Sequence, residues 1–121
     1  MESILTSIKK LLGITEDCED FDPDLIMHIN SVFMILNQLG VGPPEGFRIE
    51  DDSSYWADFT SDDIAIESVK TYMHMKVKLL FDPPLSSSVM NCMNQMISEL
   101  EWRLHVTVDP GQNNEEVIQN G

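Results

Sequence analysis

The loop before the second helical segment contains aspartates with the alternation of a calcium-binding loop. Asp20, Asp22 and Asp24 have the spacing of its first three ligands. Leu25, however, occupies the position that must be glycine, and Ser31 occupies that of the bidentate glutamate. We therefore interpret these aspartates as a solvated cap for the helix that follows, and we expect no metal ion there.

The run Glu50-Asp51-Asp52 offers neighbouring carboxylates, which a bound cation or general acid–base catalysis would require. No histidine or lysine lies near this run in the sequence to complete a hydrolytic site. The run therefore predicts a polar turn. A metal-dependent hydrolase is the weakest functional alternative that the sequence offers.

The remaining side chains with catalytic or metal-binding chemistry are scattered. His28, His74 and His105 lack the His-x-x-x-His spacing of a zinc-binding helix. Cys18 and Cys92 lie in unlike settings, which favours two free thiols, with Cys92 packed on a helix. The sequence has no nucleophile turn and no glycine-rich phosphate loop. We expect no enzyme activity, no catalytic residue, no cofactor and no metal.

The composition is that of one acidic domain. The chain has 121 residues, with 21 acidic and 7 basic side chains and a net charge of −14. This charge opposes binding to phosphate backbones, so partners should offer positive or apolar surfaces. No apolar run approaches the ~20 residues of a membrane span, and no signal peptide is recognisable. We expect a protein without membrane contact that stays in the cytoplasm where it is made.

Apolar residues recur with helical spacing in four segments, residues 3–12, 22–39, 60–81 and 86–106. Gly13 and Gly40 follow the first two segments and supply their C-terminal stops. Thr60 and the acidic residues after it provide a start signal for the third segment. The expected fold is an all-α, four-helix domain with a long central helix.

The third and fourth segments form a helical hairpin, because Phe81-Asp82-Pro83-Pro84 cannot continue a helix and serines 86–88 can start another. Apolar residues on one face of each helix should face the core. On the third segment they are Ile66, Val69, Tyr72, Met73, Val77 and Leu80, and on the fourth Val89, Met93, Met96, Ile97, Leu100 and Leu104.

Between the second and third segments lies a stretch without helical periodicity. Phe47 and Ile49 alternate with polar residues, and a polar turn then precedes Tyr55 and Trp56. This pattern predicts a small β-hairpin within residues 45–58. Trp56 is also a candidate for partner contact.

The helical domain is expected to span residues 1–106 and to be followed by a C-terminal tail or arm at 107–121. This tail is rich in Asn, Gln and Glu, a composition typical of disordered segments.

Three apolar side chains project from polar helix faces. Met27 and Met34 lie nearly opposite the main apolar face of their helix, which favours a second contact there. Trp102 lies on the polar side of the last helix, so either the 41–60 segment covers it or it anchors a partner.

Lys70, His74 and Lys78 follow one another at i, i+4 and i+8 on the long helix and form a basic strip in an acidic chain. The strip is either an ordinary solvated face or a contact for the acidic loops of an identical neighbour. A head-to-tail contact between unlike patches closes into a ring when its rotation permits.

Several blocks occur in an order that resembles the head–tail connector proteins of long-tailed bacteriophages and prophages. They include Phe81-Asp82-Pro83-Pro84 and Glu99-Leu100-Glu101-Trp102-Arg103-Leu104, together with residues 8–14, 21–22, 29–33, 36–43, 56–59 and 76–80. The resemblance covers nearly the whole chain, and none of these blocks is a catalytic signature.

The resemblance implies a virion neck protein that is assembled in the cytoplasm of the host bacterium. It implies a ring, typically of twelve subunits, that docks on the portal through the C-terminal arm, extends the DNA channel and binds the next head-completion or tail protein. An acidic lumen would let DNA pass without specific binding, because it repels the phosphates. Glu50, Asp51 and Asp52 are candidate lining residues of that channel.

The chief rival is an acidic DNA-mimic or inhibitor protein that binds a basic host enzyme. The net charge of −14 fits this rival. It leaves the long core helices and the outward apolar residues unexplained.

Overall fold

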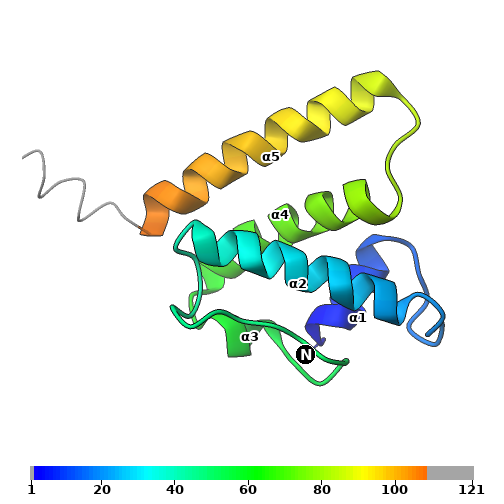
Figure 1. Cartoon of the computed structure of the whole chain (residues 1–121), viewed down its shortest axis with the longest axis horizontal. Helices are drawn as coiled ribbons and strands as arrows, with labels where there is room; N and C mark the ends of the chain where they lie inside the picture. The colour runs from blue at the N-terminus through cyan, green and yellow to red at the C-terminus, as the bar shows by residue number, and fades with distance from the viewer. Residues whose placement is uncertain (1, 109–121) are drawn as a thin grey trace, which may run out of the picture.

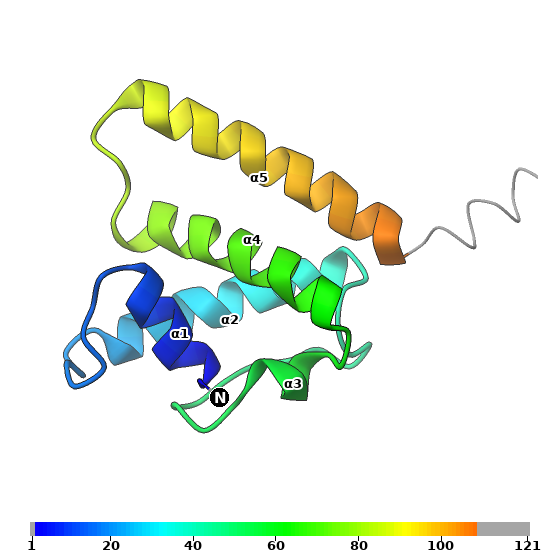
Figure 2. The same cartoon turned by 180° about the vertical axis from the view of Figure 1, so that it is seen from behind.

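The computed structural model describes residues 2–108, which form five helices (Figure 1). They are α1 (Ile4–Leu11), α2 (Asp22–Gln38), α3 (Trp56–Phe59), α4 (Asp63–Phe81) and α5 (Ser87–Val108). Helix α4 is central, since it contacts α1, α2 and α5. Seen from behind, α1 crosses in front of α2 on one side of α4, and α5 lies on the opposite side of α4 (Figure 2). The all-α prediction is confirmed, with one short additional helix, α3.

Local chemistry explains where the helices begin and end. Ser3 caps α1 by accepting a hydrogen bond from the backbone N–H of Thr6 at 3.1 Å. Gly13 and Gly40 have φ angles of 80° and 82°, which favour glycine after a helix. The cap of α4 is Asp62 rather than the expected Thr60, and its carboxylate accepts from two backbone N–H groups of the first turn.

The core is formed where α1, α2 and α4 meet. Helix α2 contributes Phe33, which is in ring contact with Phe47, Phe59 and Trp56. Burying a side chain of this size contributes about 2–3 kcal/mol. The fully buried apolar side chains are Ile4, Ile8, Leu25, Ile29, Val32, Phe33, Leu36, Ile49, Val69, Tyr72, Met73 and Val77.

The predicted β-hairpin within residues 45–58 is wrong, since no strand is assigned in that segment. Ile49 bonds instead to the side chain of Asn30 on α2, which accepts from its N–H at 2.8 Å and donates to its carbonyl at 2.9 Å. A single antiparallel bridge joins Tyr55 to Ser3. The Asp58 carboxylate accepts from the Tyr55 N–H at 2.9 Å and so stabilises the helical turn α3. No hairpin forms at Ile49 because the Asn30 side chain already bonds the backbone N–H and C=O of this residue, which a partner strand would have paired.

The predicted α4–α5 hairpin forms, but its two arms diverge toward the proline-containing loop (Figure 1). Ile97 and Leu104 of α5 are buried, whereas Val89 and Met96, which were expected in the core, are exposed. Leu80 of α4 is exposed for the same reason. The prediction that Cys92 is packed is also wrong, since this thiol is exposed.

The C-terminal half of α5 is attached to the rest of the fold by polar contacts as well. The buried Tyr72 donates a hydrogen bond of 2.7 Å to the Glu101 carboxylate. His105 Nδ1 lies 3.3 Å from the carbonyl oxygen of Leu39 at the end of α2. Helix α5 continues through Val108, past the predicted boundary at residue 106. The expected arm lies, from residue 109 on, outside the described residues.

Candidate interaction surfaces

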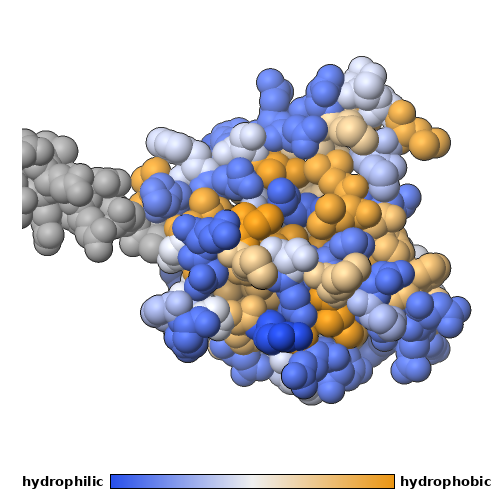
Figure 3. Space-filling view, viewed as in Figure 1, coloured by the Kyte–Doolittle hydropathy of each residue, from blue (hydrophilic) through white to orange (hydrophobic). Residues whose placement is uncertain are grey.

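The exposed methionines of α2 border a groove, which we call the α2 groove. Met27 and Met34 are 58% and 65% exposed, as their outward position in the sequence predicted. With Ile26, Phe33 and Phe47 they line a hollow of about 670 Å³ between α2 and residues 45–48. Its charged lining residues are Glu45 and Arg48, which have opposite signs. The space-filling view shows apolar atoms over α2 between polar groups (Figure 3).

Asn37 of α2 keeps the wall of this groove in place. Its side-chain amide donates to the carbonyl oxygens of Pro43 and Pro44 at 3.2 and 3.3 Å. Asn30 holds the other end of the same segment through Ile49. The groove is therefore built into the fold by side chains of α2 and does not depend on a ligand.

The basic strip of α4 is partly used within the chain itself. The Lys78 ammonium lies 3.5 Å from the Asp82 carboxylate, and Lys70 is half-buried. Burial lowers the pKa of His74, with the Lys78 charge as the second cause, while a hydrogen bond with the Leu11 backbone acts in the opposite direction. Within residues 2–108, His74 Nε2 is buried without a hydrogen-bond partner. The strip is a half-buried face beside α1 rather than a fully exposed row of cations.

The acidic run at residues 50–52 lies in an exposed turn. The Asp51 carboxylate accepts hydrogen bonds from the hydroxyl and the N–H of Ser53, and these bonds lower its pKa. Asp52 shares a small hollow of about 200 Å³ with Glu2 and Glu16. Carboxylates from three separate segments therefore meet on the side of the molecule that carries α1.

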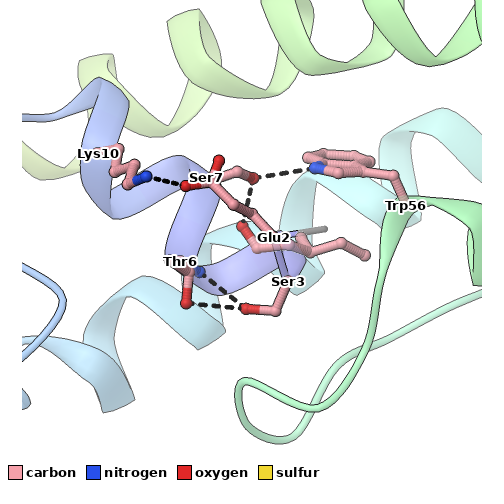
Figure 4. Close-up of polar contacts among 7 residues, drawn as sticks. Glu2, Ser3, Thr6, Ser7, Lys10 and Trp56 are labelled. Carbon is pink, nitrogen blue, oxygen red and sulfur yellow. Dashed lines mark hydrogen bonds and ion pairs between the residues drawn. The ribbon is translucent and has the colours of Figure 1, made fainter.

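Polar contacts on the first turns of α1 hold this acidic side in place (Figure 4). The indole N–H of Trp56 donates to the Ser7 hydroxyl at 2.9 Å, and that hydroxyl donates to the Ile4 carbonyl. Glu2 forms an ion pair with Lys10. Trp56 is only 5% exposed, so its side chain is used inside this fold and is not open to a partner in this conformation.

Lys9 is a structural residue that the sequence did not reveal. It is 2% exposed, and its ammonium lies 2.9 Å from the Asp22 carboxylate and 3.0 Å from the Glu16 carbonyl oxygen. It therefore fixes the acidic loop between α1 and α2 to the fold. In the sequence, only the six acidic residues at positions 16–24 signal a need for a nearby cation.

Trp102 is 66% exposed on α5. The alternative in which residues 41–60 cover it is therefore wrong. Its use as a partner anchor stays a prediction.

The part of the chain that the structure describes holds no group of three or more His, Cys, Asp or Glu side chains placed to bind a metal ion. Over the same residues, no helix is long and apolar enough to cross a membrane. Cys18 and Cys92 are both free thiols.

Comparison with known proteins gives one family. A family model described as "Phage connector protein" matches residues 4–111. Neither the curated proteins nor the solved structures contain a significant match to this chain. The matched region contains all five helices, the α2 groove and the acidic turn. The chain therefore belongs to the phage connector protein family, which confirms the resemblance to head–tail connectors.

Proposed function

We infer that this protein is a ring subunit of the virion neck that docks on the portal, extends the DNA channel and links it to the next head-completion or tail protein. The observation that carries this proposal is the family match over residues 4–111. Connectors are structural proteins, so the match favours this role over an acidic DNA mimic. It also favours a function carried by interaction surfaces over one carried by an active site.

The distribution of charge supports a channel role. Glu50, Asp51 and Asp52 are exposed, and Asp52 lies with Glu2 and Glu16 on the α1 side. A ring with this side inward would repeat these carboxylates around its lumen. Their field acts over about 8 Å at physiological ionic strength, which is enough to keep phosphates from adhering to the wall. DNA would then pass without specific binding.

The proposed portal contact is the C-terminal arm predicted at residues 107–121, of which residues 109–121 follow the end of α5. Helix α5 leads into this arm, and the half of α5 next to it is the anchored half, through Leu104, Tyr72–Glu101 and His105. The arm therefore begins from a fixed point on the domain. Trp102, exposed on the same half of α5, is the candidate anchor for the next neck protein.

The portal contact is tested by removing residues 109–121, which leaves α5 complete through Val108. We expect the truncated chain to lose co-sedimentation with purified portal rings while its far-UV circular dichroism and melting temperature stay unchanged. Trp102→Ala is the matched variant, since it alters α5 outside the arm and should keep portal binding. Retained portal binding by the truncated chain would contradict the proposed role of the arm.

The channel contact is tested by the triple substitution Glu50→Lys, Asp51→Lys and Asp52→Lys. Virions that carry it should release DNA more slowly, since the lumen would now attract phosphates. Reversal of Glu19, Asp20 and Glu67, which are exposed and lie outside the hollow at Asp52, changes the net charge equally and should leave release unchanged. Equal rates for both triple variants would argue against a lumen at residues 50–52.

A further inference from the structure

The two longest stretches without Asp, Glu, Lys or Arg are residues 25–44 and 83–98. The first contains most of α2 and ends before Glu45. The second contains the loop after α4 and the first half of α5, and we call it the uncharged tip. In a chain with 28 charged residues of 121 and a net charge of −14, such stretches would be expected inside the core.

Both stretches are instead partly exposed. In the uncharged tip, Leu85 is fully exposed and Val89 and Met96 are about half-exposed. In the first stretch, Met27 and Met34 are exposed beside the α2 groove. Exposed surfaces that are depleted of charge and contain methionine are typical of the centres of protein interfaces.

The two surfaces differ in shape and in position. The α2 groove is concave and has room for an apolar side chain, whereas the uncharged tip projects where α5 diverges from α4. In Figure 1 α4 lies between α5 and α2, so the uncharged tip and the α2 groove lie on different sides of α4. Apolar atoms also mark the outer edge near the α4–α5 loop (Figure 3). One chain cannot bring these two surfaces together, but two chains can.

We propose that the uncharged tip of one copy, led by Leu85 and Val89, docks in the α2 groove of the next copy. The occupant is a second copy because both surfaces lack net charge in a chain of net charge −14, so they are where two copies approach each other with little repulsion. The charges of Glu45 and Arg48 at the groove cancel. The contact is head-to-tail, the type that closes into a ring. This inference rests on the proposed ring and names its subunit interface.

Because the proposed contact joins surfaces without net charge, it does not involve the basic strip of α4. A contact between Lys70 and Lys78 and the acidic loops of a neighbour would weaken as salt screens it. A contact between uncharged surfaces of acidic chains strengthens with salt, because screening reduces the repulsion around it. Sedimentation velocity at rising salt therefore separates the two interfaces by the sign of the effect.

The interface is tested by Leu85→Glu with Ile64→Glu as its matched control. Both residues are large, apolar and largely or fully exposed, and both substitutions raise the negative charge by one. We expect Leu85→Glu, and Met34→Glu on the groove side, to abolish self-association at every salt concentration, while Ile64→Glu associates as the parent chain does. Equal association of all three variants would overturn the interface.

Cross-linking keeps the test decisive when the free chain associates weakly. In a Cys18→Ser, Cys92→Ser background, chains with Leu85→Cys are mixed with chains carrying Met34→Cys and oxidised, alone and with the portal. We expect a disulfide-linked dimer from this mixture and none from Ile64→Cys with Met34→Cys. Portal binding without the expected cross-link in either condition would overturn this inference and leave the proposed function intact. Cross-linking without portal binding would support the subunit interface and contradict the proposed docking on the portal.

Discussion

The base of the molecule, where α1, α2 and α4 meet, and the uncharged tip differ in what surrounds their apolar side chains. At the base, Phe33 is enclosed by other rings, and Lys9 is buried and paired with Asp22. At the tip, Leu85 and Val89 meet solvent, although the sequence there contains no charge. Apolar residues at the base hold the fold together, and those at the tip are available to a partner.

Phe33→Ala should have the largest effect on stability. It removes the ring at the centre of the aromatic cluster and leaves a cavity, so we expect a loss of about 3–5 kcal/mol in the free energy of unfolding. Val89→Ala at the tip should cost less than about 1 kcal/mol, since the side chain is half-exposed. Urea titrations measure both. Similar losses for the two variants would erase the distinction between base and tip.

Lys9→Met should cause the next largest loss in the free energy of unfolding. It keeps the apolar stem but leaves Asp22 without its cation, and we expect a loss of about 2 kcal/mol, less than for a fully buried pair because Asp22 retains some solvent contact. The neighbouring Lys10→Met removes an exposed ion pair with Glu2 and should leave the melting temperature unchanged. If Lys9→Met melted like Lys10→Met, the acidic loop would not depend on this anchor.

Tyr72→Phe should lower the local stability of the C-terminal half of α5, which is anchored to α4, and leave that of its exposed N-terminal half unchanged. It removes the hydrogen bond to Glu101, at a cost of about 1 kcal/mol, and hydrogen exchange should rise around Glu101 rather than at the tip. Burial, together with this bond, raises the pKa of Tyr72. Stability should therefore fall above about pH 10, where the unfolded tyrosine ionises, and the fall should be smaller in Tyr72→Phe. If stability fell equally steeply above pH 10 in Tyr72→Phe, the assignment of this pH dependence to Tyr72 would be contradicted.

Substitution of His74 should have the smallest effect on stability. Because its pKa is lowered in the fold, the unfolded chain binds the proton more readily, and stability should fall as the pH drops below about 6.5. His74→Gln should flatten this slope in urea titrations between neutral and acid pH. A slope that persists in the variant would have to arise from other groups.

The sequence predicted the elements that depend on neighbouring residues. The four predicted helices, the stops at Gly13 and Gly40 and the proline break after Phe81 are all present. Each of them is determined by residues within one or two helical turns.

Features that depend on distant parts of the chain were missed. The Asn30–Ile49 bonds replace the expected β-hairpin, and the burial of Lys9 depends on a loop seven or more residues away. The divergence of α5 leaves exposed an apolar face that helical periodicity alone assigned to the core. Periodicity identifies an apolar face, but it does not say whether the same chain or another covers it.

An electron cryomicroscopy reconstruction of the protein bound to its portal tests the central claim most directly. We predict a closed ring in which Leu85 of each copy lies in the α2 groove of its neighbour, with residues 50–52 lining the lumen. A ring in which Leu85 faces solvent and the methionines of α2 contact nothing would contradict the proposed division between a folding base and an assembling tip.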